Sequence, residues 1–174
     1  MCLVFWSEFE LTHHNRAGSI RILSDALRFN PRLLKAIYPL LKRFTLEEVR
    51  GMLPQSTAVW LHYGQLAHAE GKESAYFFTR SLEFLDQEQK ISPHYFIQVY
   101  TFYRQQKEEE KAAQILRLGI EWLPEYAPFH IHLGDYYRRG KKVQQAENAY
   151  QQALHLDPRN DAIRKRISQL VKQK

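Results

Sequence analysis

A recurring step of about 34 residues constrains the fold of this chain more than any other feature of its sequence. Residues 127–160 place Leu133, Gly134 and Tyr137 in their first half and Ala146 and Tyr150 in their second half. The preceding segment, 93–126, has large and small residues at the matching places without a gap: Phe96, Val99, Tyr103, Ala112, Leu116, Gly119 and Pro124. Because self-similarity at a fixed period is typical of repeat architectures, the sequence predicts stacked units.

The segment 127–160 resembles a tetratricopeptide repeat (TPR). That family has Leu-Gly and an aromatic residue on a first helix, small, large and small residues on a second helix, and a final Pro; here His130 replaces the usual opening Trp. The resemblance implies an all-α fold, a right-handed α-solenoid of stacked antiparallel helix hairpins with a C-terminal capping helix. Tyr100 stands where a small residue is usual, so we expect the hairpin of 93–126 to splay or repack there.

The repeat scheme divides the chain into segments of one predicted TPR-like domain, 1–174. The expected parts are a degenerate unit (1–32), a shortened helical hairpin (33–56), three units (57–92, 93–126 and 127–160) and a capping helix (161–174). A single hairpin cannot bury both of its faces, so stability is expected to come from contacts between neighbours. The small residues Gly134, Ala146 and Ala153 should let two helices approach closely.

Charge and motifs narrow the function classes. Of the net charge of +6, residues 57–158 contribute 11 basic and 13 acidic side chains, whereas residues 159–174 contribute 6 and 1. Since a polyanion needs several cations converging on one face, this distribution disfavours nucleic acid as the partner. The sequence has no G-x-S-x-G, Walker, dinucleotide-binding or H-E-x-x-H motif, so we predict a protein that is not an enzyme and uses no cofactor.

Single residues exclude further classes. His130 and His132 lie two apart on a predicted helix and point to different sides, so no metal site is predicted. The only cysteine, Cys2, cannot form an internal disulfide and leaves both cytoplasm and periplasm open as the compartment. No segment approaches the roughly 20 apolar residues of a membrane span.

The resemblance assigns a ligand to the concave groove lined by the first helices of successive hairpins. Counting along those helices predicts an aliphatic row, a polar row and a cationic row: Leu61, Ile97 and Ile131; Gln65, Thr101 and Asp135; His68, Arg104 and Arg138. Such a groove suits a peptide with an apolar anchor and carboxylates, which arginine can bind bidentately. The carboxylate clamp of chaperone-binding members needs Lys and Asn at inner positions where this chain has other residues, so a chaperone-tail adaptor is not expected.

We therefore predict a non-catalytic scaffold that binds a partner peptide or protein with apolar and acidic side chains. Two alternatives remain open. One is the soluble TPR tail of a bacterial membrane protein of envelope glycan assembly, similar to O-antigen ligases, with the apolar start Met1–Trp6 as the cut edge. The other is an RNA-binding helical repeat that uses the basic ends and the ring-rich segment 95–103.

Overall fold

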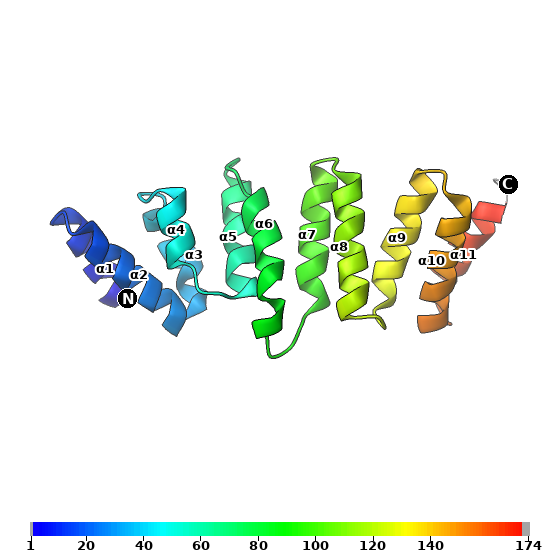
Figure 1. Cartoon of the computed structure of the whole chain (residues 1–174), viewed down its shortest axis with the longest axis horizontal. Helices are drawn as coiled ribbons and strands as arrows, with labels where there is room; N and C mark the ends of the chain where they lie inside the picture. The colour runs from blue at the N-terminus through cyan, green and yellow to red at the C-terminus, as the bar shows by residue number, and fades with distance from the viewer. Residues whose placement is uncertain (1, 172–174) are drawn as a thin grey trace. The chain divides into compact units, whose positions relative to one another are not determined.

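The computed structural model describes the backbone of residues 2–171, and within that range it consists of helices and their connections (Figure 1). The α-helices are α1 (Cys2–Thr12), α2 (Arg16–Phe29), α3 (Leu34–Leu41), α4 (Leu46–Met52), α5 (Thr57–Ala69), α6 (Ala75–Ser81), α7 (Pro93–Gln105), α8 (Glu109–Trp122), α9 (Ala127–Arg139), α10 (Val143–Leu156) and α11 (Asp161–Val171). Two short 3₁₀ helices, η1 (Pro31–Leu33) and η2 (Leu82–Gln87), complete the order. The predicted all-α helical-repeat class is confirmed.

Contacts between residues divide the chain into two compact units, 1–90 and 91–174. The division into repeats and the single domain over 1–174 stay predictions. In the second unit, α7 packs on α8, α8 on α9, α9 on α10 and α10 on α11, so each helix touches the next along the chain. In the first unit, α1 packs on α2, α2 on α4, α3 on α5 and α5 on α6.

Close approach of helices in the second unit depends on small residues facing rings. A Cβ atom added to Gly134 in α9 would lie 2.5 Å from the ring of Tyr150 in α10. Tyr150 is completely buried in a cluster with Ala146, Ala153, Ile163 and Leu170. Since Ile163 and Leu170 belong to α11, this helix covers the apolar side of the last hairpin, as expected of a cap.

In the first unit, other residue types allow neighbouring helices to pack closely. In α1 and α2, the buried hydroxyls of Ser7 and Ser19 lie 3.0 Å apart, so two small polar residues allow the helices to meet. Further along the unit, the rings of Tyr63 and Phe77 join α5 to α6, with their centroids 4.4 Å apart. The rest of the core combines buried leucine and isoleucine side chains of α2 and α3 with aromatic side chains such as Trp60 and Phe84.

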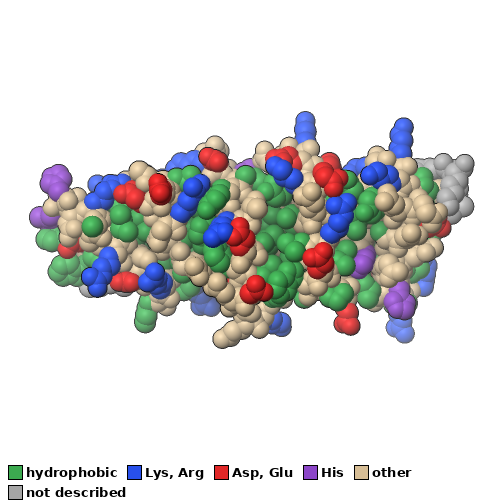
Figure 2. Space-filling model, viewed as in Figure 1, with side chains coloured by type: hydrophobic (Ala, Val, Ile, Leu, Met, Phe, Trp, Pro, Cys, Tyr) green, Lys and Arg blue, Asp and Glu red, His purple; other side chains and the backbone are tan. Residues whose placement is uncertain are grey.

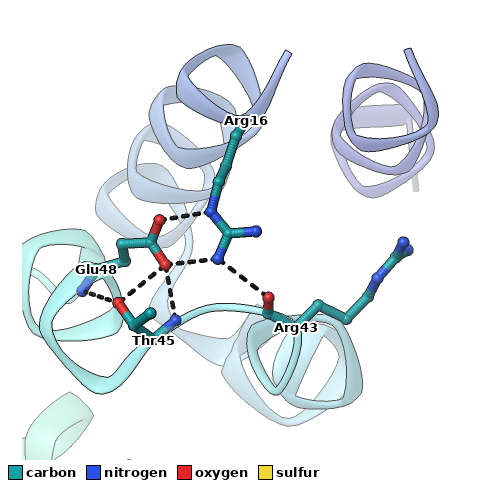
Figure 3. Close-up of polar contacts among 4 residues, drawn as sticks. All are labelled: Arg16, Arg43, Thr45 and Glu48. Carbon is teal, nitrogen blue, oxygen red and sulfur yellow. Dashed lines mark hydrogen bonds and ion pairs between the residues drawn. The ribbon is translucent and has the colours of Figure 1, made fainter. Parts of the chain in front are cut away.

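A polar network fixes the start of α4 and ties it to α2 (Figure 3). The Thr45 hydroxyl accepts a hydrogen bond from the backbone N–H of Glu48, and a Glu48 carboxylate oxygen accepts one from the backbone N–H of Thr45, which forms a capping box. Arg16 in α2 donates from Nε and Nη2 to the two oxygens of Glu48, each at 2.6 Å, and from Nη2 to the Arg43 carbonyl. This bidentate pair sets where α4 lies against α2.

Gly134→Ala should destabilise the protein by about 1–3 kcal/mol, because the added methyl group would overlap the buried Tyr150 ring. The matched control is Gly51→Ala in α4, where an added Cβ meets nothing within 4 Å and alanine favours the helix. Urea unfolding followed by circular dichroism measures both. Equal stabilities of the two variants would contradict the close packing of α9 on α10.

Stability should also depend on the ionisation of Glu48. The pKa of Glu48 is lowered to about 2, chiefly by the hydrogen bond from Arg16 and next by the Thr45 backbone N–H. A carboxyl whose pKa is lower in the folded chain stabilises the fold above its unfolded pKa, and the contribution is lost as the pH falls toward 2. The wild-type protein should therefore lose more stability than Glu48→Gln when the pH falls from about 5 to about 3, and thermal unfolding at each pH measures this loss. Glu47→Gln, a change of the exposed neighbour, should follow the wild type.

Candidate functional site

Asp135 in α9 is the centre of a polar cluster in the second unit. Its Oδ1 atom accepts a hydrogen bond of 2.7 Å from the Tyr150 hydroxyl in α10 and one of 3.3 Å from Nε of Arg166 in α11. Nη2 of Arg138, one turn further along α9, lies 3.9 Å from the same oxygen. The Asp135 side chain is 18% exposed, so its charge is largely committed to these internal partners.

A ring pair lies beside this cluster. The centroids of Tyr100 in α7 and His132 in α9 are 5.0 Å apart, and the Arg104 guanidinium lies 5.7 Å from the Tyr100 ring centre. Burial lowers the pKa of His132; Asp135 opposes this shift, while the charges of Arg104 and Arg166 add to it. His132 is therefore neutral at pH 7, and the positive charge of the site comes from its arginines.

The six groove residues predicted in this unit lie on α7 and α9. Thr101 and Arg104 are exposed on α7, and Ile97 of the same helix is half-buried. On α9, Ile131 is half-buried against the cluster around Tyr150, and Arg138 is exposed beside Asp135. The structure thus brings Asp135 and Arg138 together, and a groove role for the six residues stays a prediction.

The remaining three predicted residues lie on α5 in the first unit. Leu61 is only 2% exposed, so its side chain offers almost no surface to a peptide. Gln65 is exposed, and His68 is half-buried, with Nδ1 3.4 Å from the Ser74 hydroxyl oxygen. Of the predicted aliphatic row, only Ile97 and Ile131 in the second unit retain accessible surface.

Several solved structures share this arrangement of helices. The first TPR of Spaghetti (RPAP3), bound to the HSP90 peptide SRMEEVD, matches 68% of this chain and 93% of its own with a TM-score of 0.54 and 17% identity. The Arabidopsis OM64 TPR domain matches 69% of this chain and 98% of its own with a TM-score of 0.54 and 14% identity. MamA 41-end from Desulfovibrio magneticus RS-1 matches 99% of this chain and 83% of its own with a TM-score of 0.54 and 13% identity.

This chain has the TPR fold. The resemblance seen in residues 127–160 is confirmed at the level of structure. No protein-family model matches the chain, and neither does any curated protein. Because so few residues of the similar structures are identical to those of this chain, the similarity establishes the TPR fold alone.

Sequence reasoning overlooked the partners of Asp135. The sequence contains one indication of the position of Arg166. Arg166 follows His132 by one full TPR period of 34 residues, so it occupies on α11 the repeat position that His132 occupies on α9. Continuing the repeat register into the capping helix would have placed Arg166 on the same face as His132.

Metal binding and membrane insertion were also open possibilities for the described part of the chain. Within it, no three His, Cys, Asp or Glu side chains are grouped so that they could hold a metal ion. None of the helices seen between residues 2 and 171 combines the length and apolar character needed to cross a membrane.

Asp135→Ala should destabilise the protein by about 1–3 kcal/mol, because it removes the acceptor of the buried Tyr150 hydroxyl and the partner of Arg166. Asp135→Asn keeps a side-chain acceptor for Tyr150 and should cost less. The two variants can be compared with the wild type by urea unfolding. The prediction fails if Ala and Asn have the same effect, since the tyrosine hydrogen bond would then contribute nothing measurable.

Proposed function

We propose that this TPR protein is a non-catalytic scaffold that binds an acidic peptide segment of another protein against α7, α9 and α11. The observation that carries the proposal is an excess of guanidinium groups around one carboxylate. Arg104 and Arg166 act on His132, and Arg138 and Arg166 lie beside Asp135, which carries the only negative charge among these five side chains. Arg139, which also acts on His132, is paired with Glu109. A carboxylate ligand would complement the remaining positive charge.

Accessibility supports Arg104 and Arg138 as the contact residues. Both are exposed, and the Arg138 pair with Asp135 has a separation of 3.9 Å, near the limit of an ion pair. Asp135 therefore holds the guanidinium of Arg138 only loosely, and the further contact of Arg138 is with the Tyr150 hydroxyl. Thr101 offers a neighbouring hydroxyl, and the half-buried Ile131 offers apolar surface for an aliphatic anchor of the peptide.

The peptide we propose differs from a chaperone tail. The RPAP3 structure holds the HSP90 peptide SRMEEVD, but this chain has Ile97 and Thr101 on α7 and Ile131 and Asp135 on α9 where the carboxylate clamp needs Lys and Asn. Asp135 would repel a carboxylate placed next to it. The acidic groups of the peptide should instead meet Arg104 and Arg138.

Binding rather than catalysis fits the environment of His132. Its neighbours are the Tyr100 ring and the charges of Asp135 and nearby arginines, and burial lowers its pKa, so the ring adds no positive charge to the site. The ring therefore serves as a neutral packing element between α7 and α9.

A peptide array tests the proposal. Short peptides that vary in their content of Glu, Asp and Leu are applied to the protein, and the affinities of the selected peptides are then measured by fluorescence anisotropy. Peptides that combine acidic and aliphatic residues should bind best. The double variant Arg104→Glu with Arg138→Glu should weaken binding about tenfold or more, because two charge-assisted contacts become repulsive.

Arg159→Glu is the control, since it makes one substitution of the same kind, with half the charge change, in the exposed turn between α10 and α11. It should leave the affinity close to that of the wild type. Selection of basic or uncharged peptides, or unchanged binding by the double variant, would show that the arginines of α7 and α9 do not recognise a ligand.

A further inference from the structure

A surface cavity of about 670 Å³ lies in the first unit, among α2, α4, α5, α6 and η2. Its lining combines three arginines with three aromatic rings: Arg28, Arg50, Arg80, Trp60, Tyr76 and Phe84. In the face shown in Figure 2, basic and hydrophobic side chains lie next to each other over the region of α4 to α6. The volume falls in the usual range for small-ligand sites, about 300–1,000 Å³.

The aromatic wall of this cavity is well packed. The Trp60 indole N–H donates a hydrogen bond of 2.9 Å to the Pro54 carbonyl, and the centroids of Trp60 and Phe84 are 5.4 Å apart. Trp60 and Phe84 are each 5% exposed, and the Arg50 guanidinium covers the Tyr76 ring at 3.7 Å from its centre. Trp60 and Phe84 therefore offer little ring surface, whereas Tyr76 is 38% exposed and can contact a ligand beside the arginines.

Two of the three arginines have unused hydrogen-bonding capacity. Arg28 and Arg50 make no hydrogen bond or ion pair with any residue in the described part of the chain, and Nε of Arg50 is buried without a partner. Arg80 is paired with Glu83. The lining therefore carries two positive charges that no described carboxylate compensates.

The Arg50 guanidinium is held in place by the surrounding fold. Arg50 is fixed over Tyr76 of α6, and Arg28 belongs to α2, which the Arg16–Glu48 pair ties to α4 (Figure 3). The cation–π contact orients Arg50 without neutralising its charge or using its N–H groups, which lie in the plane of the guanidinium. A ligand would thus meet the Arg50 guanidinium in a defined position, which lowers the entropic cost of that contact.

We propose that this cavity binds a phosphate monoester. A phosphate monoester carries close to two negative charges at pH 7 on one compact group, and this matches the two uncompensated guanidiniums. Its oxygens are acceptors, as the donors of Arg28 and Arg50 require, and arginine binds phosphate bidentately. The site lies in the first unit and does not depend on the peptide proposed for the second.

Isothermal titration calorimetry with three phosphate probes tests this proposal on the full chain. The probes are inorganic phosphate, a short phosphoserine peptide and glucose 6-phosphate. Each of Arg28→Ala and Arg50→Ala should reduce affinity about tenfold, because charge-assisted hydrogen bonds are lost. Arg21→Ala, which removes an exposed arginine of α2 that does not line the cavity, should bind as the wild type does. Arg28 makes no polar contact within the described chain, so its replacement should leave the fold intact.

The ionisation of the phosphate gives a second readout. Because the second pKa of a phosphate monoester is about 6, binding should strengthen between about pH 5.5 and pH 7.5. The same peptide with Glu in place of phosphoserine should bind more weakly. Tightest binding of the peptide would identify a phosphorylated protein as the source, tightest binding of glucose 6-phosphate a soluble metabolite, and equal binding of all three the phosphate group itself. Each of these results supports the site.

Three results would overturn the proposal. One is the absence of saturable binding by any phosphate probe. Another is unchanged affinity in both Arg28→Ala and Arg50→Ala. The third is equal affinity of the Glu peptide and the phosphoserine peptide, since a single carboxylate would then satisfy the cavity as well as a dianion.

Discussion

The close contact of a glycine with an aromatic ring of a neighbouring helix is the interaction on which the second unit depends. At Gly134 an added Cβ would lie 2.5 Å from Tyr150, and at Gly119 it would lie 2.9 Å from Phe129. The first contact joins the helices of one hairpin, and the second joins α8 to α9 of the next hairpin. Without a Cβ at these positions the rings can be fully buried, so the same device sets the spacing within and between hairpins.

The same tyrosine connects packing to the electrostatics of the candidate site. Tyr150 fills the space above Gly134 with its ring and donates its hydroxyl to Asp135, which also holds Arg166. Burial, followed by the hydrogen bond to Asp135, raises the pKa of Tyr150 to about 12. The hydroxyl therefore remains protonated and keeps donating at any physiological pH. The position of the Asp135 charge is in this way fixed by the core of the last hairpin.

Local pattern was sufficient to predict the helices but not their side-chain partners. The helical periods around Gly134 and Tyr150 depend on residues close in sequence, and the structure has α9 and α10 there. The pairing of Asp135 with Arg166 crosses 31 residues, so counting along one helix could not reveal it. The cavity of the first unit was missed for a similar reason. Arg28, Arg50 and Arg80 come from three helices without a shared repeat register, and only the fold brings them together.

The two proposed binding surfaces show two ways in which a fold can hold an arginine. Arg166 is held by a carboxylate, so much of its charge is neutralised before any ligand arrives. Arg104 lies over the ring of Tyr100, and Arg50 lies over that of Tyr76. An aromatic face attracts a guanidinium through its quadrupole and leaves both the net charge and the in-plane donors available. Arg104 and Arg50, which lie over rings and have no carboxylate partner in the described chain, therefore keep their charge for anion recognition, as does the exposed Arg28. Arg166 and Arg16, whose carboxylate partners are close, chiefly stabilise the fold.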